Sequence, residues 1–196
     1  MHEQLWDKVS GLDPVDVAVR TRCRFENDAF AVPLAGRDYT VAVGDRRVTP
    51  ADSPDEPAGY LEQLCILAYL INAQDIPLAH RLVGGEKLEA GQFFFRGHHA
   101  LPTRKLEAAF GDEPGRLVAA GDAVGAERST YGDASISIRV LPNVPVVFVI
   151  WGRDDEFEAR ASILFDETAA RQLPLDALLA AVQLTVKRLV EAAGPA

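Results

Sequence analysis

The chain has 196 residues, of which 48% are apolar and 25% are charged, close to the averages of globular proteins. This length fits one domain over residues 1–196 and is long enough for a substantial core without metal ions or disulfides. The formal net charge of -9 excludes a general electrostatic attraction to nucleic acids or to anionic membranes.

The first residues carry no secretion signal, and no apolar run approaches the length of about 18 residues that spans a bilayer. We therefore expect a cytoplasmic location and no membrane contact. Cys23 and Cys65 have no metal-ligand spacing, so each is predicted to be a reduced, buried apolar residue.

The N-terminal part predicts a short helix, a meander of strands and a long helix. Asp13 precedes a proline at the first helical position, which is typical of a helix start. From Phe25 to Val48, short extended runs separated by turn formers predict an antiparallel meander. Between Gly59 and Ala73, apolar residues recur at three- and four-residue steps and predict the central buried helix.

Residues 74–130 are the least regular part of the chain, because glycines interrupt every longer periodicity. Only Thr103 to Phe110 predicts a short helix, with Thr103 as its capping residue. Loops that carry function often have this composition. We therefore expect functional residues here, in a region whose structure the sequence leaves open.

Three strands and a helix are predicted in the C-terminal part. Residues 135–140 and 157–165 alternate between apolar and polar side chains, whereas 144–151 are apolar on both faces, as in a central strand. Short connections imply antiparallel pairing. A final helix from about Pro174 to Ala192 has one apolar stripe. The predicted fold is α+β, a largely antiparallel sheet of an N-terminal meander and a C-terminal three-strand meander, packed against the long central helix and the C-terminal helix.

The segment Phe93-Phe94-Phe95-Arg96-Gly97-His98-His99 places a cation and two imidazoles behind an aromatic run. Arg96 can clamp a carboxylate or phosphate with two parallel hydrogen bonds, and Gly97 lets the backbone approach such a ligand closely. Phe95 is a candidate ligand contact. The structural alternatives are an Arg96 that pairs with an acidic neighbour at a tight turn and phenylalanines that belong to the core.

His98 is the candidate catalytic residue, because an imidazole titrates near neutrality and can act as a general acid or base. His98 and His99 are also candidate ligand contacts, and structural or surface histidines are the alternative. Neighbouring residues diverge in strands and helices, so the pair does not predict a metal site. Trp151, at the end of the central strand, either lines a pocket at the sheet's edge or closes the core.

Three parts of the sequence, residues 91–102, 142–151 and 161–166, resemble the family called domain of unknown function DUF3786, and the similarity covers most of the chain. Members of that family occur mainly in anaerobic bacteria and archaea, and some look like fusions to an iron–sulfur module related to those of corrinoid-dependent methyl-transfer proteins. This chain has no such cysteine set. The resemblance implies a place in anaerobic cofactor or one-carbon metabolism and suggests a tetrapyrrole or corrinoid ligand, but it supplies no catalytic residues.

These residues lead to three functional hypotheses. The first is an accessory or carrier domain that binds a small anionic ligand or cofactor, of unknown identity, around Arg96-Gly97-His98-His99. The second is an enzyme of unknown class with His98 as general acid–base and Arg96 stabilising negative charge. The third is an interaction subunit whose glycine-rich middle docks on a protein partner.

Overall fold

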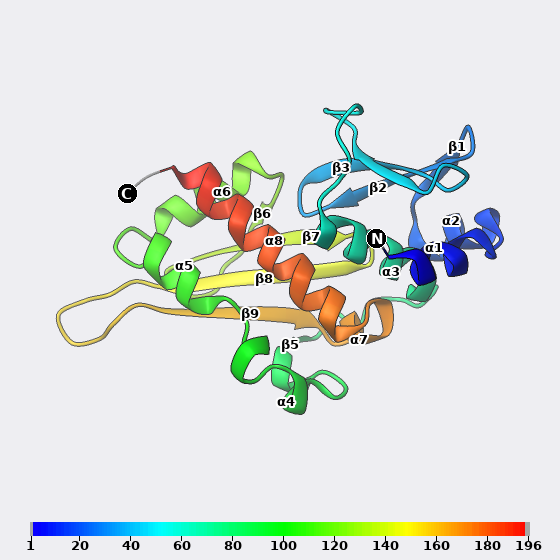
Figure 1. Cartoon of the computed structure of the whole chain (residues 1–196). Helices are drawn as coiled ribbons and strands as arrows, with labels where there is room; N and C mark the ends of the chain where they lie inside the picture. The colour runs from blue at the N-terminus through cyan, green and yellow to red at the C-terminus, as the bar shows by residue number, and fades with distance from the viewer. Residues whose placement is uncertain (1, 195–196) are drawn as a thin grey trace.

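The computed structural model describes residues 2–194, which form an α+β fold with two antiparallel sheets (Figure 1). The N-terminal sheet has the strand order β1-β2-β3-β4, and the C-terminal sheet has the order β5-β9-β8-β7-β6. One cluster of buried apolar side chains runs through both sheets and the helices that pack on them. The predicted fold class is confirmed.

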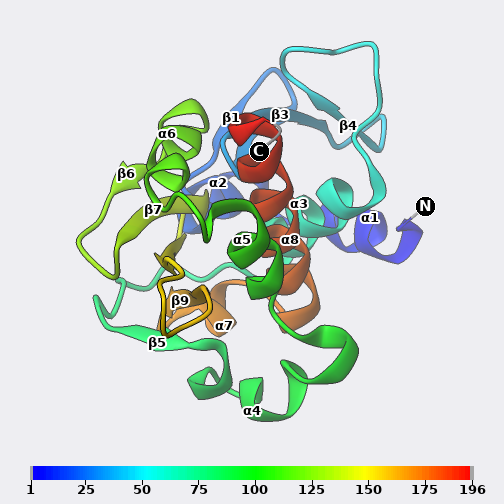
Figure 2. The same cartoon turned by 90° about the vertical axis from the view of Figure 1, so that its left-hand side faces the viewer.

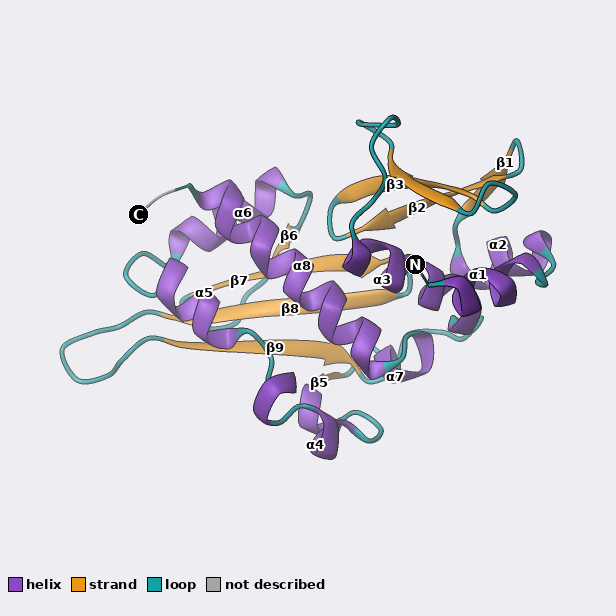
Figure 3. Ribbon diagram, viewed as in Figure 1, coloured by secondary structure: helices purple, strands orange, loops and turns teal. Residues whose placement is uncertain are grey.

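Figure 3 distinguishes the strands from the helices by colour. The strands are β1 (Arg24–Glu26), β2 (Ala29–Leu34), β3 (Arg37–Ala42), β4 (Arg47–Pro50), β5 (Leu82–Gly84), β6 (Glu127–Arg128), β7 (Ala134–Leu141), β8 (Val144–Trp151) and β9 (Arg160–Asp166). The α-helices are α1 (Glu3–Ser10), α2 (Pro14–Thr21), α3 (Tyr60–Asn72), α4 (Gly91–Phe94), α5 (Thr103–Phe110), α6 (Gly115–Ala123), α7 (Ala169–Gln172) and α8 (Leu175–Ala193). Two short 3-10 helices are η1 (Gly85–Lys87) and η2 (Gly97–His99).

The N-terminal sheet is the meander that the sequence predicts. β2 pairs with β1 and β3, and β3 pairs with β4, all antiparallel. Asn27 and Asp28 connect β1 to β2 with φ angles of 50° and 62°, and Ala35 and Gly36 connect β2 to β3 with φ angles of 51° and 80°. Two consecutive residues at positive φ suit the tight turns whose twist matches that of a hairpin.

The C-terminal sheet contains the predicted three-strand meander, with β8 between β7 and β9. The sequence places the start of the third strand at Phe157, but β9 begins only at Arg160. Asp154 explains the difference, because its Oδ1 accepts hydrogen bonds from the N–H groups of Glu156 and Phe157 and folds this stretch into a turn. The edge strands β5 and β6 lie in the region that the sequence leaves open.

The two long helices are those that the sequence predicts, and α3 and α8 pack on each other. α8 lies with α5 and α6 on one face of the C-terminal sheet (Figure 2). The predicted cap of α5 is wrong, because Pro102 occupies the cap position and Thr103 is the first helical residue. Residues 2–194 contain no helix that is both long and apolar enough to cross a bilayer.

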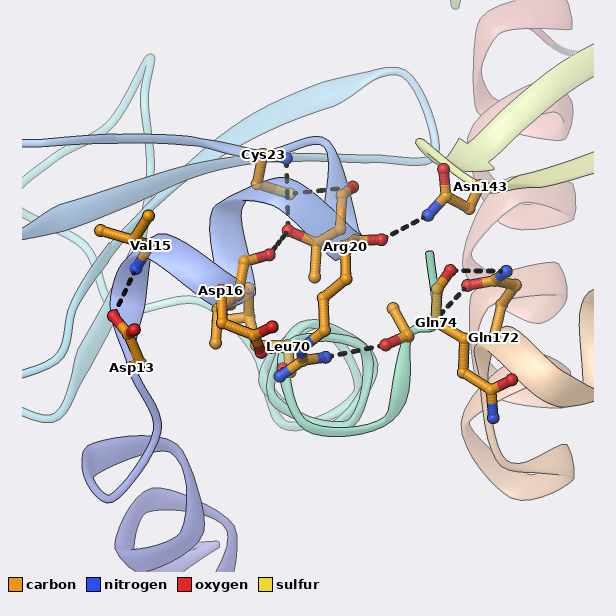
Figure 4. Close-up of polar contacts among 12 residues, drawn as sticks. Asp13, Val15, Asp16, Arg20, Cys23, Leu70, Gln74, Asn143 and Gln172 are labelled. Carbon is orange, nitrogen blue, oxygen red and sulfur yellow. Dashed lines mark hydrogen bonds and ion pairs between the residues drawn. The ribbon is translucent and has the colours of Figure 1, made fainter. Parts of the chain in front are cut away.

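A buried polar network joins α2, α3 and the turn between β7 and β8. The hydroxyl of Tyr69 donates to the carbonyl of Thr21 at 2.9 Å and accepts from the N–H of Asn143 at 3.1 Å. The side-chain amide of Asn143 donates to the carbonyl of Arg20 at 2.8 Å (Figure 4). The Arg20 guanidinium donates in turn to two carbonyls at the C-terminal end of α3. Three elements that are distant in the sequence therefore meet at one hydroxyl.

Arg188 joins α8 to the N-terminal sheet. Its guanidinium donates to the carbonyls of Leu34 and Ala35 at 2.5 and 2.8 Å, and to the hydroxyl of Tyr39 at 2.6 Å. The N–H of Ala35 donates to the carbonyl of Val140 at 2.9 Å, which ties the β2–β3 turn to β7 as well. These bonds hold the two sheets in one relative position.

We expect Tyr69→Phe to lower the free energy of unfolding by about 1–3 kcal/mol, because it leaves the buried carbonyl of Thr21 and N–H of Asn143 without their partner. Urea denaturation followed by circular dichroism measures the change. Tyr131→Phe, at a tyrosine that is 47% exposed, is the matched control and should cost less than about 0.5 kcal/mol. Equal effects of the two substitutions would contradict the role assigned to the Tyr69 hydroxyl.

Cys23 and Cys65 are buried free thiols, as the sequence predicts. Burial raises the pKa of Cys23 to about 11, against a smaller lowering by its hydrogen bond with Thr21, and burial also raises the pKa of Cys65. Since the thiolate is the nucleophile, we expect both residues to resist iodoacetamide at neutral pH and to react in guanidinium chloride. Mass spectrometry counts the adducts, and rapid labelling of the folded protein would refute this expectation.

Candidate functional site

The segment 93–99 belongs to two short helical turns beside the C-terminal sheet. α4 ends at Phe94, Arg96 has an extended backbone, and η2 follows directly. This part of the chain lies below β5 and stands apart from the two sheets in both views (Figure 1 and Figure 2). The segment is therefore a projection attached to the edge of the sheet.

Phe95 attaches this projection to the sheet. Its ring stacks on Phe165 of β9, with the centroids 6.2 Å apart, and meets the ring of Phe94 edge-on at 5.2 Å. A Cβ at position 85 would lie 2.9 Å from Phe95 Cδ2, so Gly85 leaves the room that this ring needs. Phe95 is half-buried whereas Phe93 is 74% exposed. Within the aromatic run, Phe95 therefore packs on the protein, whereas Phe93 is exposed to solvent.

Arg96 is exposed, and the protein supplies no partner for its guanidinium. Within residues 2–194, only Arg22, Arg96 and Arg104 have a guanidinium without a hydrogen bond, an ion pair or an aromatic ring in contact. The alternative of an Arg96 locked to an acidic neighbour therefore does not apply.

Residues 86–105, called here the basic segment, are positively charged in an acidic chain. Four cations stand against the two acids Glu86 and Glu89, while the whole chain has a net charge of -9. The cations are Lys87, Arg96, Arg104 and Lys105, and all four are exposed. The basic segment therefore has a formal charge of opposite sign to that of the whole chain.

His98 and His99 are both exposed. The His99 ring stacks on Phe94, with a centroid distance of 4.6 Å and an interplanar angle of 2°, whereas the His98 ring has no partner among residues 2–194. Gly97 has a φ of 56°, and a Cβ there would meet no atom within 4 Å, so this turn is open to solvent. Within residues 2–194, no three His, Cys, Asp or Glu residues are grouped so that they could hold a metal ion.

Trp151 is separated from the other candidate residues. It pairs with Arg160 across β8 and β9, and the Arg160 guanidinium lies 4.6 Å from the centroid of its ring. Phe165, which contacts Phe95, pairs instead with Val146 near the other end of β8. At about 3.3 Å per residue along a strand, Trp151 lies roughly 17 Å from that contact. The structure therefore does not bring Trp151 and the segment 93–99 into one site.

A cavity that the sequence does not predict lies where the two sheets meet. It has a volume of about 400 Å³, and its polar lining comes from Asp38, Glu127, Ser137 and Arg139. Neither the segment 93–99 nor Trp151 lines it. These polar residues lie on β3, β6 and β7, so no single stretch of sequence marks the cavity.

We expect Phe95→Ala to lower the free energy of unfolding by about 2 kcal/mol, because it removes the ring that packs on Phe165 and Gly85. Phe93→Ala, two residues earlier at an exposed ring, should cost less than about 0.5 kcal/mol. Urea denaturation of both variants measures the difference. A Phe95→Ala protein as stable as Phe93→Ala would mean that Phe95 does not hold the projection in place.

No curated protein and no solved structure matches the chain. Residues 13–188 match the family described as Domain of unknown function (DUF3786). This range contains both sheets, the basic segment and the cavity, and it ends within α8. The resemblance seen in the sequence is confirmed, and the chain belongs to the DUF3786 family.

Proposed function

We propose that this protein is a cytoplasmic accessory or carrier domain that binds a carboxylate or phosphate group through its basic segment. The observation that carries the proposal is the exposed guanidinium of Arg96, which has no partner in residues 2–194. A guanidinium forms two parallel hydrogen bonds with such a group, and a hydrogen bond to a charged group contributes about 1.5–3 kcal/mol. The two free thiols accord with a reducing compartment.

The charge around Arg96 supports an anionic ligand. Lys87, Arg104 and Lys105 belong to the same basic segment and are exposed. Charges act over a Debye length of about 8–10 Å at physiological salt, so an anion at Arg96 is largely screened from acids in distant parts of the chain. The proposal therefore does not conflict with the net charge of -9.

The shape of the projection favours an anion at the edge of a larger molecule or an acidic segment. Small-molecule pockets usually enclose most of their ligand, whereas Arg96, Gly97 and His98 are all exposed. A group that approaches Gly97 meets no side chain, because the space beside its backbone is empty. A planar group next to the anion has the exposed His99 ring to rest on.

Isothermal titration calorimetry at low ionic strength tests the proposal with inorganic phosphate, with citrate and with a glutamate-rich peptide. We expect Arg96→Ala to weaken each ligand that binds the wild type by about tenfold, because one charge-assisted contact is lost. Binding of the free anions indicates a small ligand, whereas binding of the peptide alone indicates an acidic partner segment.

Arg22→Ala is the matched control, because Arg22 is an exposed arginine without a partner in residues 2–194 and lies outside the basic segment. It should leave the affinity unchanged, whereas Arg104→Ala should reduce it. Equal binding by the Arg96→Ala and Arg22→Ala proteins would rule out Arg96 as the anion clamp. Failure of all three ligands to bind the wild type would rule out the basic segment as an anion site.

A further inference from the structure

The cavity at the junction of the sheets holds charges of both signs that are not paired with each other. Asp38, Glu127 and Arg139 all line it. Among residues 2–194, no hydrogen bond or ion pair reaches either carboxylate side chain. The Arg139 guanidinium donates one hydrogen bond, from Nη1 to the carbonyl of Pro142 at 3.0 Å, and its other N–H groups have no acceptor in the described chain. All three side chains are exposed, so the cavity offers water or a ligand charged groups of both signs.

Strand alternation explains why Asp38 and Glu127 line the cavity while the arginine next to each of them does not. Successive side chains of a strand point to opposite faces. Arg37, next to Asp38 on β3, pairs with Asp52 and does not line the cavity. Arg128, next to Glu127 on β6, pairs with Asp122, with Nη2 and Oδ2 3.2 Å apart, and does not line the cavity either. On both strands the acid lines the cavity, and the arginine beside it does not.

The walls of the cavity are held together by direct contacts. The β2–β3 turn is hydrogen-bonded to β7 from the N–H of Ala35 to the carbonyl of Val140 at 2.9 Å. Gly36, at a φ of 80°, packs so closely on Val124 at the end of α6 that a Cβ there would collide with the Val124 carbonyl. The cavity of about 400 Å³ is thus preformed, and this volume is typical of small-molecule sites, which span about 300–1,000 Å³.

We infer that this cavity binds a small zwitterion that carries a protonated amine and a carboxylate. The ligand amine pairs with Asp38 or Glu127, and the ligand carboxylate accepts from the N–H groups of Arg139 that have no acceptor in residues 2–194. A simple anion would meet two like charges in the cavity, and a simple amine would leave the guanidinium uncompensated. A molecule with both groups satisfies both signs, and this site is separate from the basic segment.

Titrations followed by amide chemical shifts in NMR spectra test the inference with amino acids in which the spacing between amine and carboxylate increases. The probes are glycine, β-alanine, γ-aminobutyrate and ε-aminocaproate, each at about 10 mM, which detects millimolar dissociation constants. At least one should shift the amide signals of Gly36, Gly125 and Ser137 saturably, and should bind about tenfold more tightly than the alkylamine or the fatty acid of the same chain length. If no amino acid produces a saturable shift at these lining residues, the inference is wrong.

Variants then identify the groups that bind the best of these probes. Arg139→Gln and the double variant Asp38→Asn, Glu127→Gln should each weaken it by about tenfold, since each removes one sign of charge. Asp45→Asn, at an exposed acid in the β3–β4 turn, is the matched control and should bind like the wild type. Arg96→Ala should also bind normally, so loss of the anion site and loss of this site are distinguishable. Unchanged binding in both cavity variants would overturn the assignment.

Discussion

The hydroxyl of Tyr69 is the interaction on which the arrangement of the chain depends. α3 is buried from Cys65 to Leu70, so this polar atom must be satisfied inside the core. Burial raises the pKa of Tyr69, so it stays a neutral hydroxyl that both donates and accepts. Its two partners are backbone groups of Thr21 and Asn143, which cannot change rotamer to follow it. The hydroxyl therefore fixes where α2 and the β7–β8 turn lie against α3.

The position of the two sheets follows from this arrangement and from α8. Arg188 of α8 holds the carbonyls at the β2–β3 turn, and that turn is hydrogen-bonded to β7. The N-terminal meander is therefore attached to the C-terminal sheet at one corner, where Gly36 allows close contact with the end of α6. The cavity lies at this corner, so it is a product of how two simple meanders are joined.

Charge is distributed unevenly over this framework. Most arginines have partners within the protein. Arg20 of α2 donates to carbonyls at the end of α3, and Arg188 of α8 donates to carbonyls at the β2–β3 turn. Exposed ion pairs contribute little to stability, but they remove a cation from the groups that can bind a ligand. What remains is an open basic segment around Arg96 and a partly enclosed cavity with Arg139 and two acids. These two places differ in shape and charge, so they suit different ligands.

Periodicity determined the regular elements from the amino-acid sequence alone. The helices over 60–72 and 175–193 and the strands over 134–141 and 160–166 have apolar residues spaced to match one buried face, whereas the strand over 144–151 is apolar on both faces. Such patterns are local properties. The α+β class follows from the order of these elements. The sequence also singled out Arg96, beside a glycine and two histidines, as a candidate, but by local composition and not by periodicity.

Only the tertiary structure decided the rest, because it depends on contacts between residues that are far apart in the sequence. β5 and β6 exist as strands by pairing with β9 and β7, and Phe95 is packed because Phe165 lies beside it. Whether Arg96 is paired depends on where the acids of other elements lie. Trp151 is distant from the segment 93–99 because it lies at the end of β8 that is far from Phe165. The polar residues that line the cavity come from three strands, and the periodicity of apolar residues within a strand does not determine how strands lie relative to one another.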